Sequence, residues 1–408
     1  MTTHTLQTLE TFDGGVANPR GFRAAGQYVG IKAAGKGLDL ALIVSDTPAT
    51  AAAVFTINKA QAAPVTVSKE HLAASGGVAR AIIVNSGCAN ACTGAVGMQD
   101  ARDMASLMAS QVGCPANQVL VASTGVIGVN LKMERIREGL PGAIGTLAVD
   151  QGPAAAKAIM TTDPFPKEAA ARVSVDGTDI VIGGMAKGSG MIEPMMATML
   201  GFITTDAAVP LPLLQRALKD VVNDTFNAIT VDGECSTNDC VMILANGASG
   251  VTIDEASYGT FVDALRAVCL PLAIGIVRGG EGATKLVTVN VTGAATPDEA
   301  RRCAKAIANS PLVKTAIHGG DPNWGRLIAV AGRAGVAFEL DRAEVTIGPI
   351  VLFRNGRPYD EAAPEAASYL KHSELTVSVN LGAGTSSSTV WTCDLSAEYV
   401  KINAEYRT

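Results

Sequence analysis

Histidine, aromatic residues and charge are all scarce in this 408-residue chain. It has four histidines, aromatic residues make up 4% and charged residues 17%, whereas about a quarter of an average globular protein is charged. Apolar residues make up 48%, and there are 43 glycines, so the chain has enough material for closely packed buried layers in two or three domains. The net charge is −6 and no basic block stands out, which argues against nucleic acid or an anionic membrane as the main partner.

Motifs of several common enzyme classes are also missing. Neither Gly-x-Ser-x-Gly nor His-Glu-x-x-His occurs, which argues against a serine hydrolase elbow and a zinc protease helix. The lysine within 184–189 stands in the wrong order for a Walker loop, so nucleotide use is not expected. Among the histidines, only His318 lies in a sequence typical of a site-lining loop. The eight cysteines are too loosely spaced for a zinc knuckle, so we expect free thiols and no metal.

No targeting or membrane-spanning segment is predicted. The first ten residues lack a basic region followed by an apolar stretch. The longest apolar run, 268–277, contains Pro271 and is too short to cross a bilayer. The sequence therefore predicts a cytoplasmic protein.

Short apolar strands alternate with amphipathic helices, which predicts an α/β fold. Buried strands are expected at 81–85 and 119–122, and helices at 99–112 and 213–222. The last third differs, because apolar residues alternate with polar ones at 287–291 and 375–381, as in half-buried strands. Thr296-Pro297-Asp298-Glu299 predicts a capped helix start, and Asn355-Gly356 predicts a hairpin. We therefore expect a smaller α+β unit at about 286–408.

The segment from Met185 to Leu200 has two local interpretations. It is a glycine-rich lead that ends at Ala197-Thr198, followed by the apolar stretch Met199-Leu200-Gly201-Phe202-Ile203. From composition alone, a strand, a loop and a second strand are favoured, with Thr198 merely a polar loop residue.

This segment resembles the self-processing site of the glutamate/ornithine N-acetyltransferases of arginine biosynthesis. In that family the precursor cleaves itself before the threonine of an Ala-Thr-Met-Leu tetrapeptide. Other segments similar to the family are 85–94, 123–128, 159–163, 232–239, 321–326 and 401–408. Six matches in the right order cover nearly the whole chain and make the resemblance specific. Two places depart from the pattern: Cys88 replaces a more usual asparagine, and Glu234-Cys235 replaces Asp-Thr.

The resemblance implies a fold and a division of the chain. The fold is an α/β/β/α-type sandwich of the N-terminal-nucleophile-like kind, with the smaller α+β unit attached. Cleavage between Ala197 and Thr198 would give an α fragment, 1–197, and a β fragment, 198–408. Two copies of each fragment are expected to assemble.

The scarcity of histidine fits such a nucleophile. A threonine hydroxyl is weak unless a base lies beside it. The amine created by cleavage before Thr198 would have a pKa of about 7.7–8.0, so it could act as that base near neutral pH. One residue would thereby serve both processing and catalysis.

The resemblance also assigns site residues. Thr124 and Gly125 are implied as the oxyanion hole, and their place at the end of a buried strand suits this role, although an ordinary strand-ending turn is favoured without the resemblance. Lys187 is expected to bind the substrate carboxylate, and Glu281 to hold the ornithine amine unless it is a solvated loop residue. The remaining substrate contacts implied are Thr161 or its neighbour Thr162, Thr198, Asn403 and Thr408.

The implied reaction is ping-pong transfer of acetyl from N-acetylornithine to glutamate, without a cofactor. The sequence leaves open whether acetyl-CoA is a second donor. One rival is a self-processed aminopeptidase or amidohydrolase with an N-terminal nucleophile, in which water takes the acyl group. Another is an inactive scaffold that never cleaves.

Overall fold

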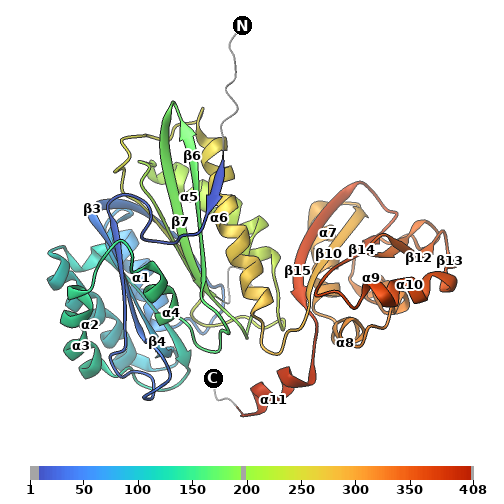
Figure 1. The fold of residues 1–408 in the computed structure, drawn as a ribbon, viewed down its shortest axis with the longest axis horizontal. Coiled ribbons are helices and arrows are strands. Elements are labelled where there is room, and N and C mark those ends of the chain that lie inside the picture. The colour runs from blue at the N-terminus through green and yellow to red at the C-terminus, as the bar shows by residue number, and fades with distance from the viewer. Residues whose placement is uncertain (1–8, 194–198, 406–408) are drawn as a thin grey trace, which may run out of the picture.

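The computed structural model describes residues 9–193 and 199–405 (Figure 1). Ala197, Thr198 and Thr408 lie outside the described residues. The first part of the chain contains β1 (Glu10–Phe12), β2 (Phe22–Gln27), β3 (Leu40–Phe55), α1 (Ala63–Ala74), β4 (Val78–Cys88), α2 (Gly94–Val112), β5 (Val119–Val126), α3 (Met133–Gly145), α4 (Gly152–Ala158), β6 (Lys167–Val175), β7 (Thr178–Lys187), β8 (Leu200–Thr205), α5 (Leu211–Asp224), β9 (Cys240–Ala245) and α6 (Tyr258–Arg278). The predicted strands and helices are confirmed, and α2 begins five residues before the expected start.

Nine strands form one sheet, in the order β1-β6-β7-β8-β9-β3-β4-β5, with β2 added on β3. The long strand β3 joins the two halves of this sheet, because it pairs with β4 through its first part and with β9 through Thr50–Phe55. The register shifts between Val44 and Ala49, where Asp46, Thr47 and Pro48 are exposed. Proline cannot donate to a strand ladder, so pairing is interrupted there and β3 passes from one half to the other.

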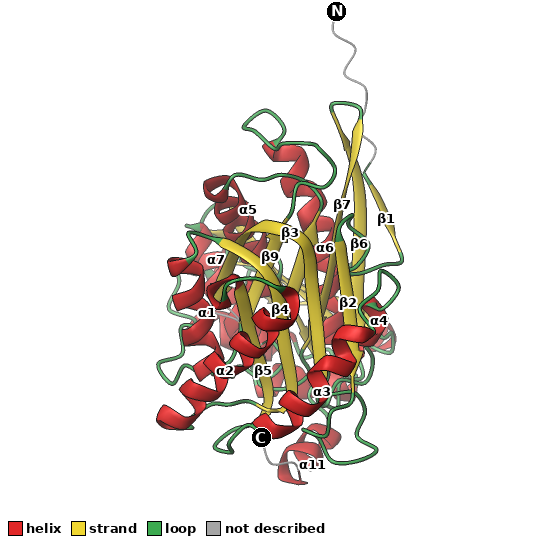
Figure 2. Ribbon diagram, turned by 90° about the vertical axis from the view of Figure 1, so that its left-hand side faces the viewer, coloured by secondary structure: helices red, strands yellow, loops and turns green. Residues whose placement is uncertain are grey.

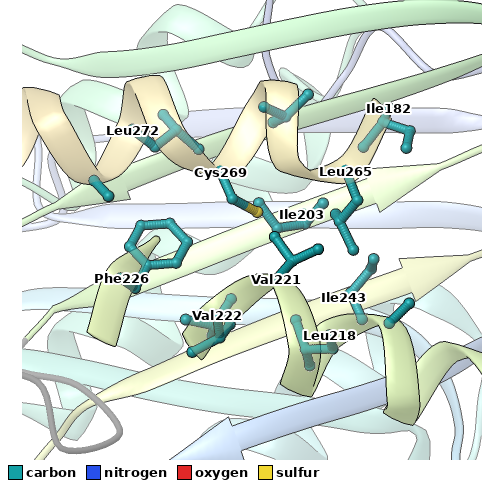
Figure 3. Close-up of a cluster of buried hydrophobic side chains, with 14 of the residues drawn as sticks. Ile182, Ile203, Leu218, Val221, Val222, Phe226, Ile243, Leu265, Cys269 and Leu272 are labelled. Carbon is teal, nitrogen blue, oxygen red and sulfur yellow. The ribbon is translucent and has the colours of Figure 1, made fainter. Parts of the chain in front are cut away.

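The two halves of the sheet pack face to face. A buried cluster between them unites Ile43 and Ile82 from one half with Phe202, Met242 and Leu244 from the other. Because successive strand residues point to opposite faces, the neighbours Ile203 and Ile243 pack outward against α5 and α6 (Figure 3). Helices α1, α2 and α3 cover the outer face of the other half (Figure 2). These layers confirm the expected α/β/β/α sandwich.

Helix α6 corrects one expectation. The run at 268–277 belongs to a 21-residue helix that continues through Pro271, which is exposed. The backbone bond removed by this proline is therefore lost on the solvent side. Among the described residues, α6 is the one helix long and apolar enough to cross a membrane by length and composition. Its residues Phe261, Leu265 and Leu272 are buried in the core against α5 and the sheet, as in a core helix.

A second, six-stranded sheet occupies the last part of the chain, in the order β13-β12-β11-β14-β10-β15. The elements are β10 (Leu286–Ala294), α7 (Pro297–Ala308), α8 (Pro311–Gly319), α9 (Trp324–Arg333), β11 (Glu344–Ile347), β12 (Ile350–Arg354), β13 (Arg357–Pro358), α10 (Ala363–Tyr369), β14 (Glu374–Asn380), β15 (Ser386–Cys393) and α11 (Ala397–Glu405). The predicted cap is confirmed, since Thr296 accepts a bond from the Glu299 amide. Asn355 and Gly356 both have positive φ in the β12–β13 turn, as the hairpin requires. After β15 the chain leaves this unit through α11 (Figure 1).

Candidate active site

A pocket lies where the ends of β5 and β7 meet the start of β8 and helix α11. The predicted site residues that line it are Thr124, Gly125, Thr161, Lys187, Glu281 and Asn403, together with Thr162. Every predicted site residue that the structure describes is thus found in one pocket. Leu200, two residues after Thr198, lines it as well. Lys187 and Leu200 are register partners in the β7–β8 pair, so the end of β7 and the start of β8 lie side by side at the pocket.

Gly125 sits in backbone that only glycine tolerates. Its φ is +129°, and a Cβ there would collide with the carbonyl carbon of Gly87 on the neighbouring strand β4. The close approach of the two strands sets the end of β5 at a fixed place in the pocket wall. On the same strand, the Ser123 carbonyl accepts a bond from Asn238 Nδ2 at 2.8 Å, which ties the end of β5 to the loop before β9. Because Gly125 lines the pocket and lacks a side chain, it leaves room for a ligand to approach the backbone closely.

Lys187 ends β7 and points at the threonines of the pocket. Its ammonium donates to Thr161 Oγ1 at 2.9 Å and to Thr124 Oγ1 at 3.3 Å. Only 11% of its side chain is exposed. Of the two candidate threonines, Thr161 therefore contacts the lysine. Among the described residues that line the pocket, Lys187 is the only cationic side chain.

Asp163 is a buried carboxylate close to Lys187, and the sequence analysis did not single it out. Its carboxylate accepts bonds from Lys167 Nζ at 2.7 Å, the Gly188 amide at 2.7 Å and the Thr161 amide at 3.0 Å, and Lys187 Nζ lies 4.0 Å away. Burial acts to raise the pKa of Asp163, but Lys187, Lys167 and the Gly188 amide outweigh it and lower the pKa to about 2. The carboxylate is therefore charged and fixes both Lys187 and the loop that bears Thr161.

Replacing Asp163 with asparagine should destabilise the protein by about 3–5 kcal/mol, because it leaves the buried Lys167 without its counter-ion. The pKa of Asp163 is lower in the folded state than its ordinary value of 3.8. Its stabilising contribution is therefore complete above about pH 4 and is lost as the pH falls toward about 2. Thermal unfolding midpoints measured from pH 7 to pH 2 should show a large difference at pH 7 that shrinks in acid.

Asp46→Asn is the matched control for this variant. Asp46 pairs with Arg23 at the surface, with about half of its side chain exposed, so the change should cost less than about 1 kcal/mol. A loss of stability for Asp163→Asn no larger than that of Asp46→Asn would contradict the structural role given to Asp163.

Glu281 and Asn403 both line the pocket and contact each other. Asn403 Nδ2 donates to Glu281 Oε2 at 2.9 Å, and Glu281 is 8% exposed. A Cβ at Gly190 would collide with the same oxygen, so a side chain there would displace this carboxylate from its present position. Glu281 is thus a buried wall residue, and the alternative of a solvated loop glutamate is wrong.

Helix α11 is fastened onto the pocket at its start. Ser396 Oγ donates to the Gly282 carbonyl at 2.6 Å, and a Cβ at Gly282 would collide with the Tyr399 amide nitrogen. Tyr399 Oη donates to Asp232 Oδ2 at 3.2 Å, and burial together with this carboxylate raises the pKa of Tyr399. The return of the chain end to the site could not be derived from the sequence pattern.

The pocket is lined by side chains of both charges. Lys187 is cationic, while Asp232, Glu234, Asp239 and Glu281 are acidic. Such a pocket suits a small molecule that carries a carboxylate and an amine at separated positions.

Two residues that depart from the family pattern, Glu234 and Cys88, differ in their relation to the pocket. Glu234 lines the pocket, whereas Cys88 is buried beside Thr124 in sheet register and does not line it.

His318 lies in the last turn of α8, where its Nδ1 is 2.6 Å from Asp394 Oδ2. The expectation that His318 belongs to a site-lining loop is therefore wrong. Among the described residues, no group of three or more candidate metal ligands is found.

Comparisons with known protein sequences cover nearly the whole chain. The sequence model of the ArgJ family matches residues 23–408. The arginine biosynthesis bifunctional protein ArgJ of Symbiobacterium thermophilum is 48% identical over 406 residues, which cover 98% of this chain and 100% of that protein. The protein of the same name from a Synechococcus species is 50% identical over 412 residues, covering 98% and 99%. The solved structure of an ornithine acetyltransferase complexed with ornithine, from Mycobacterium tuberculosis, is 40% identical, with a TM-score of 0.43, and covers 47% of this chain and 100% of that one.

Proposed function

This chain belongs to the ArgJ family, and from that membership we propose that it transfers the acetyl group of N2-acetyl-L-ornithine to L-glutamate, with Thr198 as the nucleophile. It is an acetyltransferase of arginine biosynthesis. The observation that carries the finer proposal is the pocket itself, in which Lys187 contacts Thr124 and Thr161 and Glu281 is held by Asn403.

The charges of the pocket suit both substrates. Donor and acceptor are α-amino acids, so the α-carboxylate of each would bind to Lys187 in the same place. The side-chain amine of N-acetylornithine would bind to Glu281, which is buried and lines the same pocket. Between them, Thr124 and Gly125 would stabilise the oxyanion of the reacting acetyl group. One pocket would therefore serve both half-reactions, as ping-pong transfer requires.

Self-cleavage would create the nucleophile. The Thr198 hydroxyl would add to the Ala197 carbonyl carbon, the C–N bond between the two residues would break, and the nitrogen would take up a proton as the new amine. Water would then open the resulting ester, giving the Ala197 carboxylate and the free Thr198 hydroxyl. The short distance in sequence from Thr198 to Leu200, a pocket residue, supports the use of the same oxyanion donors in both steps.

In each turnover the Thr198 amine would take the proton of the hydroxyl as it attacks the acetyl carbonyl. Ornithine would leave with that proton, and the acetyl group would remain on Thr198 as an ester. The amine of glutamate would attack this ester, release N-acetylglutamate and restore the hydroxyl.

The proposal includes the state of the chain in the cell. The α fragment, 1–197, would supply Thr124 and Lys187, and the β fragment, 198–408, would supply Glu281, Asn403 and Thr408. The fragments must therefore stay together, and we propose two copies of each, in the cytoplasm. No cofactor is needed for this chemistry, and acetyl-CoA would act only as an additional acetyl donor.

Incubation of the purified protein with N-acetylornithine should release more than one ornithine per active site only when glutamate is present, with N-acetylglutamate formed in equal amount to this further ornithine. Amino-acid chromatography of the two products measures this. Release of ornithine at the same rate without glutamate would identify the protein as a hydrolase instead. A separate incubation with acetyl-CoA and glutamate tests for the second donor.

A further inference from the structure

The chain just ahead of the proposed cut is held by the 231–234 loop. The carboxylate of Asp232 accepts bonds from the amides of Met191 and Ile192, both at 2.7 Å. The Glu193 amide donates to the Glu234 carbonyl, also at 2.7 Å. Met191 has a φ of +59°, a conformation that costs free energy in a residue with a side chain and persists only where neighbours impose it. The backbone up to Glu193 is therefore fixed.

The side chain of Glu193 is held by a different part of the molecule. Asn309 Nδ2 donates to Glu193 Oε2 at 2.6 Å, and Lys305 Nζ lies 3.8 Å from the same oxygen. Only about 15% of the Glu193 side chain is exposed. Lys305 also donates to the Ile229 carbonyl at 2.8 Å. Both partners belong to the C-terminal end of helix α7, in the unit built on the second sheet.

These contacts join the two proposed fragments at a sensitive place. Glu193 stands four residues before Ala197 in the α fragment, whereas Lys305 and Asn309 belong to the β fragment. None of the three residues lines the pocket. On the far side of the proposed cut, the Met199 carbonyl accepts a bond from the Cys240 amide at 3.1 Å. The described residues on both sides of 194–198 are thus anchored.

We propose that Glu193 is a positioning residue for self-cleavage, gripped by Asn309 and Lys305 of helix α7 so that the chain enters the pocket at a fixed place. The inference rests on the proposed function, since it concerns the cut between Ala197 and Thr198. Its physical basis is proximity: attack within a chain is fast only when the reacting atoms are held in line, and a misplacement of about 1 Å costs roughly a hundredfold in rate. The unit built on the second sheet then has a role in self-cleavage, although its residues Lys305 and Asn309 do not line the pocket.

The test follows cleavage of freshly synthesised precursor on denaturing gels. Glu193→Ala should slow the conversion to two fragments by about tenfold or more. Glu193→Gln keeps an acceptor oxygen for Asn309, so its rate should stay within about threefold of the parent. Glu255→Ala is the control, because Glu255 forms an ion pair with Arg216 at the surface and its loss should leave the rate unchanged.

Two further measurements separate positioning from a general structural defect. Once cleavage of Glu193→Ala is complete, kcat and KM for acetyl transfer should lie within about twofold of the parent, since Glu193 does not line the pocket. Cleavage should also stay slow in Glu193→Ala combined with Lys305→Met, which removes the unpaired cation. Parent-like cleavage of Glu193→Ala, restored cleavage in the double variant, or an equal loss of transfer activity would each overturn the proposal. A parent chain that never cleaves would refute the proposed function itself, and with it this role.

Discussion

Replacement of Thr198 with alanine should leave the chain whole, so that a denaturing gel shows one band at 41.6 kDa where the parent shows two fragments of similar mass. The hydroxyl removed by this change is the proposed nucleophile of both self-cleavage and acetyl transfer. Without it neither an internal ester nor an acetyl ester forms, and the transfer rate should fall by about a thousandfold or more. The gel and the ornithine-release assay measure the two losses on the same preparation.

Thr198→Ser and Thr162→Ala are the controls for this variant. Serine keeps a hydroxyl and should still cleave. Thr162 lines the pocket, but Lys187 donates to its neighbour Thr161, so Thr162→Ala should also give two fragments. Two fragments from Thr198→Ala itself would refute the assignment of the nucleophile. A single band from the parent would instead favour the inactive scaffold.

The sequence predicted the layers of the fold better than it predicted how the layers connect. The patterns of apolar residues predicted β4, β5, α2 and α5, because burial of one or two faces of an element produces a regular pattern in the local sequence. No local sequence pattern predicts that β3 passes between the two halves of the sheet. It depends on pairing with both β4 and β9, which lie far apart in sequence.

Helix α6 is a second case in which the local sequence pattern did not predict the structure. A proline within an apolar run usually marks a helix end, and here the helix continues because Pro271 faces solvent. Which face of a helix is buried follows from its tertiary contacts. A local pattern that contains both a breaker and a long apolar stretch does not decide between them.

The pocket was predictable only through the resemblance. Thr124, Lys187, Glu281 and Asn403 come from four distant segments, and no spacing between them indicates contact. Asp163 escaped notice although it lies within one of the similar segments, because its effect depends on Lys167 and Lys187 meeting it in a buried place. A local sequence does not reveal which carboxylate will be enclosed between two lysines.

Lys187→Met should lower kcat/KM for acetyl transfer by about 10²–10³, the second largest effect expected. Methionine keeps much of the buried length and loses the charge, so the α-carboxylate of the substrate loses its partner, which is worth about 2–5 kcal/mol for a buried charge pair. The same change frees Thr124 Oγ1 and Thr161 Oγ1 from the ammonium that now orients them. Rates should be divided by the cleaved fraction seen on the gel, so that slow processing is not counted as slow transfer.

The contrast with Glu281→Gln makes this prediction specific to the proposed chemistry. Both substrates carry an α-carboxylate, so Lys187→Met should raise KM for N-acetylornithine and for glutamate alike. Only the donor carries a side-chain amine, so Glu281→Gln should raise KM for N-acetylornithine much more than for glutamate. The new amide keeps an acceptor oxygen for Asn403, and an unchanged KM for glutamate would report that this wall of the pocket has kept its place. Equal effects of the two variants on both substrates would mean that Lys187 and Glu281 do not bind the two ends of the ligand, and the substrate orientation proposed from their opposite charges would have to be abandoned.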